Sequence, residues 1–329
     1  SAAGGGILIA LMALHKIHIG TLGFGQFATS VLSGLNYGIG FMLIHMLHCT
    51  VATKQPAMTA ASFAEQVELN ERGRAVENKL AKLLIDVCRS QSVAVFGNVT
   101  IAILLACIVS AAYAANTQQP LLDAHTVAYQ MKSVDIITQP TLWYAAIAGV
   151  WLFCSGIISG YFDNRCNYLN LRMRLRHHPI LKMLLPQTLR GKLADYWHNN
   201  YGTLMGNLCF GMLLGMTGFI GHALDLPFDI RHVAFSSANV GYAAVSGSIG
   251  ILVFLQSVFF VLLIGMVNLV VSFSITLWVA LRSRETKIDG WWQIIRYAWL
   301  QVKQNPRSLF LPPQENTENA PATEGDAEK

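Results

Sequence analysis

Long apolar runs recur along the chain and alternate with more polar connections. Five of these runs reach the roughly 20 residues that a helix needs to cross a bilayer. They cover residues 30–52, 93–115, 141–160, 203–223 and 250–281. A sixth run, 4–14, is too short to span as it stands. The pattern predicts an all-α fold, a polytopic membrane helix bundle with five to six transmembrane helices.

Two of the more polar segments have the pattern of amphipathic helices. Over 62–91, apolar residues recur at helical spacing among charged ones, which is typical of a cytoplasmic helix with a packing seam. Over 288–304, tryptophans gather near one helix face, which is typical of a helix lying among lipid headgroups. From Pro312 onward the chain has acidic residues and no large apolar ones, so we expect disorder. We therefore divide the chain into a membrane domain, 1–310, and an acidic tail, 311–329.

Composition and charge support the membrane assignment and give it an orientation. Hydrophobic residues make up 53% of the chain and charged residues 12%, about half the usual charged share, which excludes an ordinary soluble surface. Of the 23 Lys and Arg residues, all but Lys16, Lys132 and Arg231 lie on alternate connections or after the last span. By the positive-inside rule, the basic loop 161–201, the segment 53–92 and the C-terminus are cytoplasmic.

Small residues within the runs are spaced for close helix contact. Four Gly-x-x-x-Gly motifs occur, at Gly34/Gly38, Gly156/Gly160, Gly202/Gly206 and Gly211/Gly215. Such spacing lets two helix backbones approach in a membrane. The motifs predict a compact bundle or a tight oligomer.

Polar residues within an apolar run are candidates for function, because they are costly in a bilayer. His45 and His48 are three residues apart and are expected to share a helix face. With Asn36 and Tyr37 of the same run they form a candidate buried polar site. We expect hydrogen bonds to a neighbouring helix rather than a metal ion, because no spacing supplies further ligands. A proton-linked role is the alternative, and no metal or cofactor is predicted.

Residues 225–250 are too rich in small and apolar residues for a free loop, and are expected to be re-entrant or to lie at the interface. Arg231 and His232 could pair with Asp225 or Asp229. The candidate pocket on the outer face consists of Asp229, Arg231, His232, Ser236, Ser237 and Asn239. It is either part of a small-molecule or ion path or a structural cap on the bundle, and the cap is the preferred interpretation.

The basic loop carries a third candidate surface. Arg165, Arg172, Arg174 and Arg176 lie close together there, and three of them form a stripe if the segment is one helix. Such a surface could contact phosphates of anionic lipid or of DNA. A topology signal with lipid contacts is the preferred interpretation.

Three long strings resemble a known family. They are LNYGIGFMLIHMLHCTVATKQPAMTAA (35–61), SGYFDNRCNYLNLRMRLRHHP (159–179) and DIRHVAFSSANVGYA (229–243). They are similar to the bacterial transmembrane site-specific recombinase family (Gcr-type), over nearly the whole chain to about residue 311. The resemblance implies the C-terminal membrane half of a protein about twice as long. It also implies a multi-pass protein of the bacterial inner (cytoplasmic) membrane, for which the charge pattern above predicts a cytoplasmic C-terminus.

The recombinase description implies DNA strand exchange, but the residues for that chemistry are missing from this sequence. No histidine is followed three positions later by arginine, as a tyrosine recombinase requires. A serine recombinase requires a serine surrounded by clustered arginines on a soluble domain, and the Ser-rich stretch Ser236–Ser237 lies on the predicted outer face, away from the basic segments. Hydrolase, metalloprotease and nucleotide-binding motifs are also absent from the sequence. We therefore assign no catalytic residue and favour a protein that is not an enzyme.

Three functions follow from these patterns, in order of preference. The first is a membrane scaffold or anchor acting through the cytoplasmic helix 62–91 and the basic loop. The second is a small-molecule or ion transporter or channel, and the third is a recombination-associated membrane protein whose chemistry lies elsewhere. The expected partners are membrane lipids and, through 62–91, the N-terminal portion of the same protein or another subunit. A homo-oligomer is a further expectation, and nucleic acid is the weakest one.

Overall fold

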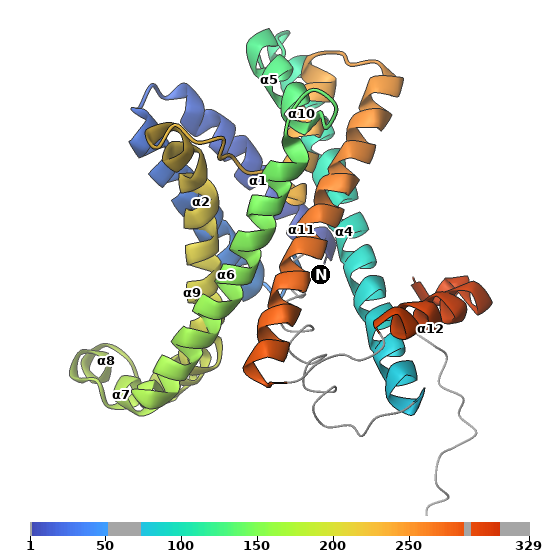
Figure 1. Ribbon diagram of the computed structural model, residues 1–329. Helices are drawn as coiled ribbons and strands as arrows, with labels where there is room; N and C mark the ends of the chain where they lie inside the picture. Colours follow the sequence, from blue (N-terminus) through green and yellow to red (C-terminus); the bar gives the residue numbers. More distant parts are fainter. Residues whose placement is uncertain (1, 52–73, 286–290, 310–329) are drawn as a thin grey trace, which may run out of the picture.

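The apolar runs form the long helices of a membrane bundle (Figure 1). The computed structural model describes residues 2–51, 74–285 and 291–309, and within these ranges the chain is helical without strands. Six helices are long and apolar enough to cross a bilayer: α1 (Ala2–Thr21), α2 (Gln26–Met46), α4 (Arg74–Thr117), α6 (Thr141–Tyr168), α9 (Gln187–Ala223) and α11 (Ile251–Ser283). Large apolar side chains such as Ile108 and Leu252 face outward, as lipid contact requires. The prediction of an all-α polytopic membrane bundle is confirmed.

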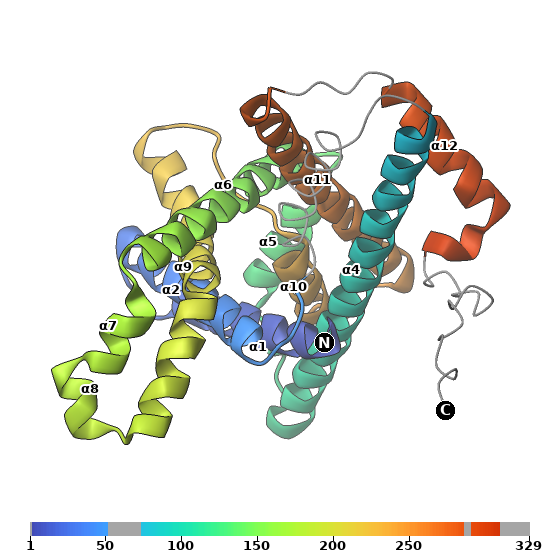
Figure 2. The same cartoon turned by 90° about the horizontal axis from the view of Figure 1, so that it is seen from below.

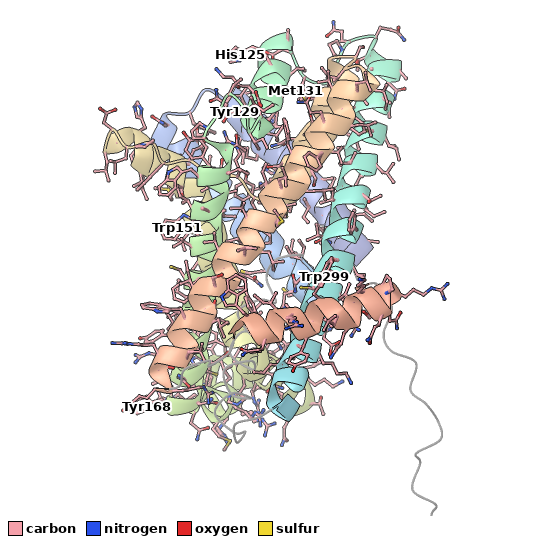
Figure 3. The ribbon with its side chains drawn as sticks, turned by 45° about the vertical axis from the view of Figure 1, so that its right-hand side comes forward. His125, Tyr129, Met131, Trp151, Tyr168 and Trp299 are labelled. Atoms are coloured by element: carbon pink, nitrogen blue, oxygen red, sulfur yellow. The ribbon has the colours of Figure 1, made fainter. Side chains whose placement is uncertain are left out.

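The shorter helices lie at the two ends of the bundle. Those at one end are α5 (Ala124–Val134) and α10 (Val233–Ser246), drawn at the top of Figure 1. Toward the other end lie α7 (Leu171–His177), α8 (Pro179–Leu184), α12 (Trp291–Gln304) and the 3-10 turn Pro306–Leu309. We call these the α5 end and the basic end. Figure 3 places His125 of α5 at the first and Tyr168, the last residue of α6, at the second.

The first span is longer than its apolar run. The run 4–14 is extended at both sides by helical residues, so that α1 covers 20 residues. Its later turns contain His15, Lys16 and His18, which the hydropathy pattern excluded from the span. The helix is therefore long enough to cross a bilayer.

One helix replaces two expected elements in the middle of the sequence. Residues 74–91 of the predicted cytoplasmic helix and the span 93–115 form one helix without a break, α4, which has 44 residues. Residues 62–73 of the predicted helix, and the tail 311–329, lie outside the described residues. At the basic end, Leu80 and Ile85 of α4 pack with Leu277 of α11 and Ile294 of α12.

Helix α12 lies across α4 at the basic end, beside the bundle rather than within it (Figures 1 and 2). Ile294 and Ala298 are buried against α4, while Trp292 and Trp299 are 80% and 66% exposed. Figure 3 shows Trp299 on the outward side of this helix. A crosswise helix with outward tryptophans suits the headgroup region of a bilayer.

Glycines hold α2 and α9 together. A Cβ atom at Gly211 would collide with the backbone of Gly38, and one at Gly215 with the backbone of Gly34. Gly206 likewise approaches Ser155 and Ser159 of α6. Three of the four predicted motifs thus place glycines at contacts between helices of this chain. In the fourth, a Cβ atom at Gly160 would meet nothing within 4 Å.

Candidate functional site: two cavities at an aromatic layer

Helix α10 is a short helix enclosed by the bundle. Ten of its 14 residues are buried. Its first amide, Val233 N–H, donates to Oδ1 of Asn268 at 3.0 Å. Since Asn268 lies near the middle of the 33-residue α11, α10 begins deep in the bundle and rises toward the α5 end. The irregular segment before it therefore reaches membrane depth.

A polar cavity of about 460 Å³ lies beside that segment, between the segment and helices α1, α2, α5, α9 and α10. We call it the α5-end cavity. Its charged residues are Lys16, Asp229 and Arg231. Its neutral polar residues are Gln26, Thr29, Ser30, Ser33, Tyr37, Tyr129, Gln130, Ser133, His232, Ser236 and Asn239. Figure 3 shows Tyr129 on α5 at this end of the molecule.

Arg231 is fixed in the wall of this cavity. Its Nη1 donates to Oδ2 of Asp229 at 2.7 Å, and its Nε donates to the Ser133 carbonyl at 2.7 Å. The guanidinium lies 5.4 Å from the ring centre of Tyr144, within cation–π range. Of the two acidic partners expected for Arg231, the structure selects Asp229 over Asp225.

His232 lines the cavity and lies among aromatic rings. Its ring centre is 6.3 Å from that of Phe41, 5.7 Å from Phe210 and 5.9 Å from Phe235. His232 is 1% exposed, and burial among these rings favours the neutral imidazole. Tyr37 stacks on Phe235 at 4.1 Å. We call Phe41, Phe210, His232 and Phe235 the aromatic layer.

A second cavity, of about 650 Å³, lies on the opposite side of this layer. It is formed by α2, α6, α9 and α11 toward the basic end, and we call it the basic-end cavity. Its lining is mainly apolar, and it includes Gly156 and Gly160. Phe41 lines this cavity while His232 and Phe235 line the other, and the two cavities share no lining residue.

A few polar side chains line the basic-end cavity. His45 Nε2 is hydrogen-bonded with Oδ1 of Asn200 at 2.8 Å. Asp163 accepts the backbone N–H of Gly202 at 2.9 Å. Asn207 is 1% exposed, and its Oδ1 has no hydrogen-bond partner within the described ranges. In the same ranges no three His, Cys, Asp or Glu side chains come together in a metal-binding group.

The structure does not bring the candidate buried site together. Helix α2 ends at Met46, so His48 lies beyond it with a left-handed φ of 53° and is exposed, away from the face of His45. Asn36 donates to the Met12 carbonyl of α1 at 2.8 Å. Tyr37 lines the α5-end cavity and His45 the basic-end cavity. His45 and His48 do not share a helix face, because α2 ends at Met46, six residues before the end of the apolar run 30–52.

The residues of the second candidate pocket lie mostly together. Asp229, Arg231, His232, Ser236 and Asn239 all line the α5-end cavity. Ser237 is fully buried and donates instead to the Ala234 carbonyl at 2.6 Å. The sequence analysis missed the contribution of Lys16, although a lysine next to an apolar run is a signal of function in a membrane.

The basic loop folds into a hairpin of short helices that extends to one side of the bundle (Figure 2). Helix α6 ends at Tyr168 and Asn170 has a φ of 48°, so the expected single stripe is interrupted and Arg165 lies on a different helix from the other three arginines. Arg172 and Arg176 of α7 both bind Asp195, at 3.0 and 2.8 Å. Arg165 and Arg174 are exposed.

Comparison with known proteins gives one match. The family model described as "Site-specific recombinase" matches residues 1–312. No curated protein and no solved structure matches the chain. The matched range includes all six candidate spans and both cavities. This chain therefore belongs to the site-specific recombinase family.

Proposed function

We propose that this chain is a membrane transport protein that moves a small solute between the α5-end cavity and the basic-end cavity. The observation that carries the proposal is the placement of two cavities on opposite sides of one aromatic layer. Their volumes, about 460 and 650 Å³, fall in the range typical of small-molecule sites. A scaffold requires no such pair.

Helix α10 supports the same function. Irregular backbone at membrane depth is tolerated where it lines a cavity, and discontinuous helices commonly form the binding sites of transporters. The segment before α10 is irregular backbone that lines a cavity, since Asp229 and Arg231 face the α5-end cavity. Helix α10, which begins deep in the bundle, resembles one half of a discontinuous helix. Under the positive-inside rule the basic end is cytoplasmic, so this cavity faces outward.

The aromatic layer is the barrier in this mechanism. Phe41 and Phe210 belong to α2 and α9, which glycine contacts hold as a unit, whereas Phe235 belongs to α10. A shift of α10 against the α2–α9 pair would part the rings. Solute binding would favour that shift only to the extent that the solute binds the shifted state more tightly.

Removal of one ring tests the barrier. We expect Phe235→Ala to increase the efflux of labelled sorbitol and gluconate from proteoliposomes, because the ring separates the two cavities. Phe260→Ala is the matched control, since Phe260 is equally a buried phenylalanine but lines neither cavity. Equal efflux from both variants, each eluting as the natural chain does on size exclusion, would count against transport. Phe235→Leu, which keeps more volume, is expected to give an intermediate efflux.

A scaffold or DNA-linked role is the alternative, favoured by the hairpin of α7 and α8 beyond the bundle. The family description also points to DNA. Either role would depend on the exposed arginines of the hairpin, and Arg172 and Arg176 already share Asp195. Under either alternative, Arg174→Ala would impair partner, lipid or DNA binding without changing solute efflux. Under the transport proposal, solute efflux changes when a ring of the aromatic layer is removed.

A further inference from the structure

Lys16 is the cation of the α5-end cavity that forms no salt bridge with a described residue. It lies in the last turns of α1, is half-buried and lines the cavity. None of the ion pairs within the described ranges includes Lys16. A partly buried ammonium without a salt bridge is unfavourable, and an anion in the cavity would relieve that cost.

The other charges of the cavity cancel. Asp229 uses Oδ2 for Arg231 and Oδ1 for the backbone N–H of Ile230, at 2.7 and 2.8 Å. Its single negative charge is thus offset by Arg231, and burial of His232 among aromatic rings favours its neutral form. With Lys16 protonated, the lining carries one net positive charge.

The rest of the lining suits a hydrophilic ligand. Hydroxyl and amide side chains from α2, α5 and α10 face the cavity, among them Ser30, Gln130 and Asn239. Such groups both donate and accept hydrogen bonds, so they fit hydroxyl groups of a ligand. Helix α10 also begins at this cavity, and the positive end of its dipole adds to the potential there.

We propose that the α5-end cavity binds a small polar organic anion with one net negative charge, and that Lys16 supplies its counter-charge. This inference rests on the proposed transport function and names the substrate class. A hydroxylated carboxylate has the required chemistry, because its hydroxyl groups match the neutral lining and its carboxylate matches the ammonium.

The preference of the cavity for anions over cations can be measured with charged thiol reagents on the full chain. Ser30→Cys places a nearly isosteric thiol in the lining, and Gln119→Cys places one on the exposed surface at the same end. Both are treated with anionic, cationic and neutral methanethiosulfonates in nanodiscs. Modification of each site is followed by peptide mass spectrometry, which separates the new thiol from the six natural cysteines.

We expect the anionic-to-cationic rate ratio at Ser30→Cys to exceed that at Gln119→Cys by about tenfold, on Coulomb's law for one nearby charge. Adding Lys16→Gln is expected to remove this excess. Lys132→Gln is the matched control, because it removes the same charge at the same end from outside the lining, and the excess is expected to persist.

The two proposals fail in different ways. Suppose first that the neutral reagent modifies Ser30→Cys, so that the cavity is accessible. If the anionic-to-cationic rate ratio then shows no excess over Gln119→Cys, or if Lys16→Gln leaves the excess unchanged, the anion assignment is overturned. The transport proposal is not affected by either result. If even the neutral reagent fails to modify Ser30→Cys, the cavity is closed to solutes, and both the anion assignment and the transport function are overturned.

Discussion

At the scale of single residues, one buried amide holds the cavity-forming segment in place. Asn268 is fully buried in α11. Its Nδ2 donates to the Ala145 carbonyl at 2.7 Å and to the Arg231 carbonyl at 3.0 Å, while its Oδ1 accepts from Val233 N–H. One side chain thus binds three backbone groups, and two of them, the Arg231 carbonyl and Val233 N–H, lie in the irregular segment and at the start of α10, where no helical partner is in place at membrane depth.

Replacement of this amide should be costly. We expect Asn268→Leu to lower the free energy of unfolding by about 3 kcal/mol, because three buried backbone groups each lose a hydrogen bond. Reversible unfolding in detergent micelles would measure the loss. Asn116→Leu is the control, since Asn116 is exposed and bonds only within its own helix, to Ala112. Equal stability of the two variants would contradict the role given to Asn268.

Single residues were only partly predictable from the sequence. The pairing of Arg231 with an adjacent aspartate was among the predictions, because both residues are close in sequence. The separation of His45 from His48 was not, since it depends on where α2 ends. Lys16 was missed because it lies at the polar margin of its apolar run, and only helix contacts place it beside Arg231.

At the scale of elements, glycines bring the backbones of α2 and α9 into close contact. Gly34 and Gly38 of α2 oppose Gly211 and Gly215 of α9 across backbone contacts. Close contact of this kind replaces the hydrophobic drive that is missing between helices in lipid. The pair also carries Phe41 and Phe210 of the aromatic layer, so its geometry sets one wall of the barrier.

A methyl group tests this contact. We expect Gly211→Ala to lower the free energy of unfolding by about 2 kcal/mol, because the added Cβ would overlap the Gly38 backbone. In Gly160→Ala the same change meets nothing within 4 Å, and should be neutral or slightly stabilising for the helix. A comparison of the two melting temperatures in one detergent decides the point. Similar melting temperatures would mean that α2 and α9 can separate at little cost.

The sequence predicted the presence of the spanning helices more reliably than the residues at which the helices begin and end. The apolar runs gave the spans because a bilayer imposes a length that is visible in composition. The joining of 74–92 to its span in α4, and the turn that divides α6 from α7, were not visible. The continuity of α4 and the break between α6 and α7 both depend on whether one helical turn continues into the next. Packing against neighbouring helices determines this, and a local pattern does not show it.

At the scale of the whole molecule, positive charge gathers at one end. Helices α7 and α8 carry arginines and lysines there, and α12 lies across the bundle at the same end (Figure 1). The opposite end presents α5 and the α5-end cavity. The proposed direction of solute entry rests on this asymmetry together with the positive-inside rule.

Sidedness can be measured directly. We expect an impermeant maleimide added to intact spheroplasts to label a cysteine at Ala128→Cys, because Ala128 is exposed and the positive-inside rule predicts the outer side for α5. A cysteine at Met183→Cys, on α8, should react only after the membrane is opened, although Met183 is 80% exposed. The reverse pattern would invert the protein and reassign the α5-end cavity to the cytoplasm.

The sequence by itself determined the class of the molecule: helical, membrane-spanning and asymmetric in charge. These properties depend only on local composition, because the length of an apolar run determines whether it can span a bilayer and the distribution of charge determines its orientation. The tertiary structure alone decided which residues share a cavity. Lys16, Tyr129 and Arg231 are far apart in the chain and meet only because α1, α5 and the segment before α10 pack together. Such meetings depend on shape complementarity between helices, which no local pattern encodes.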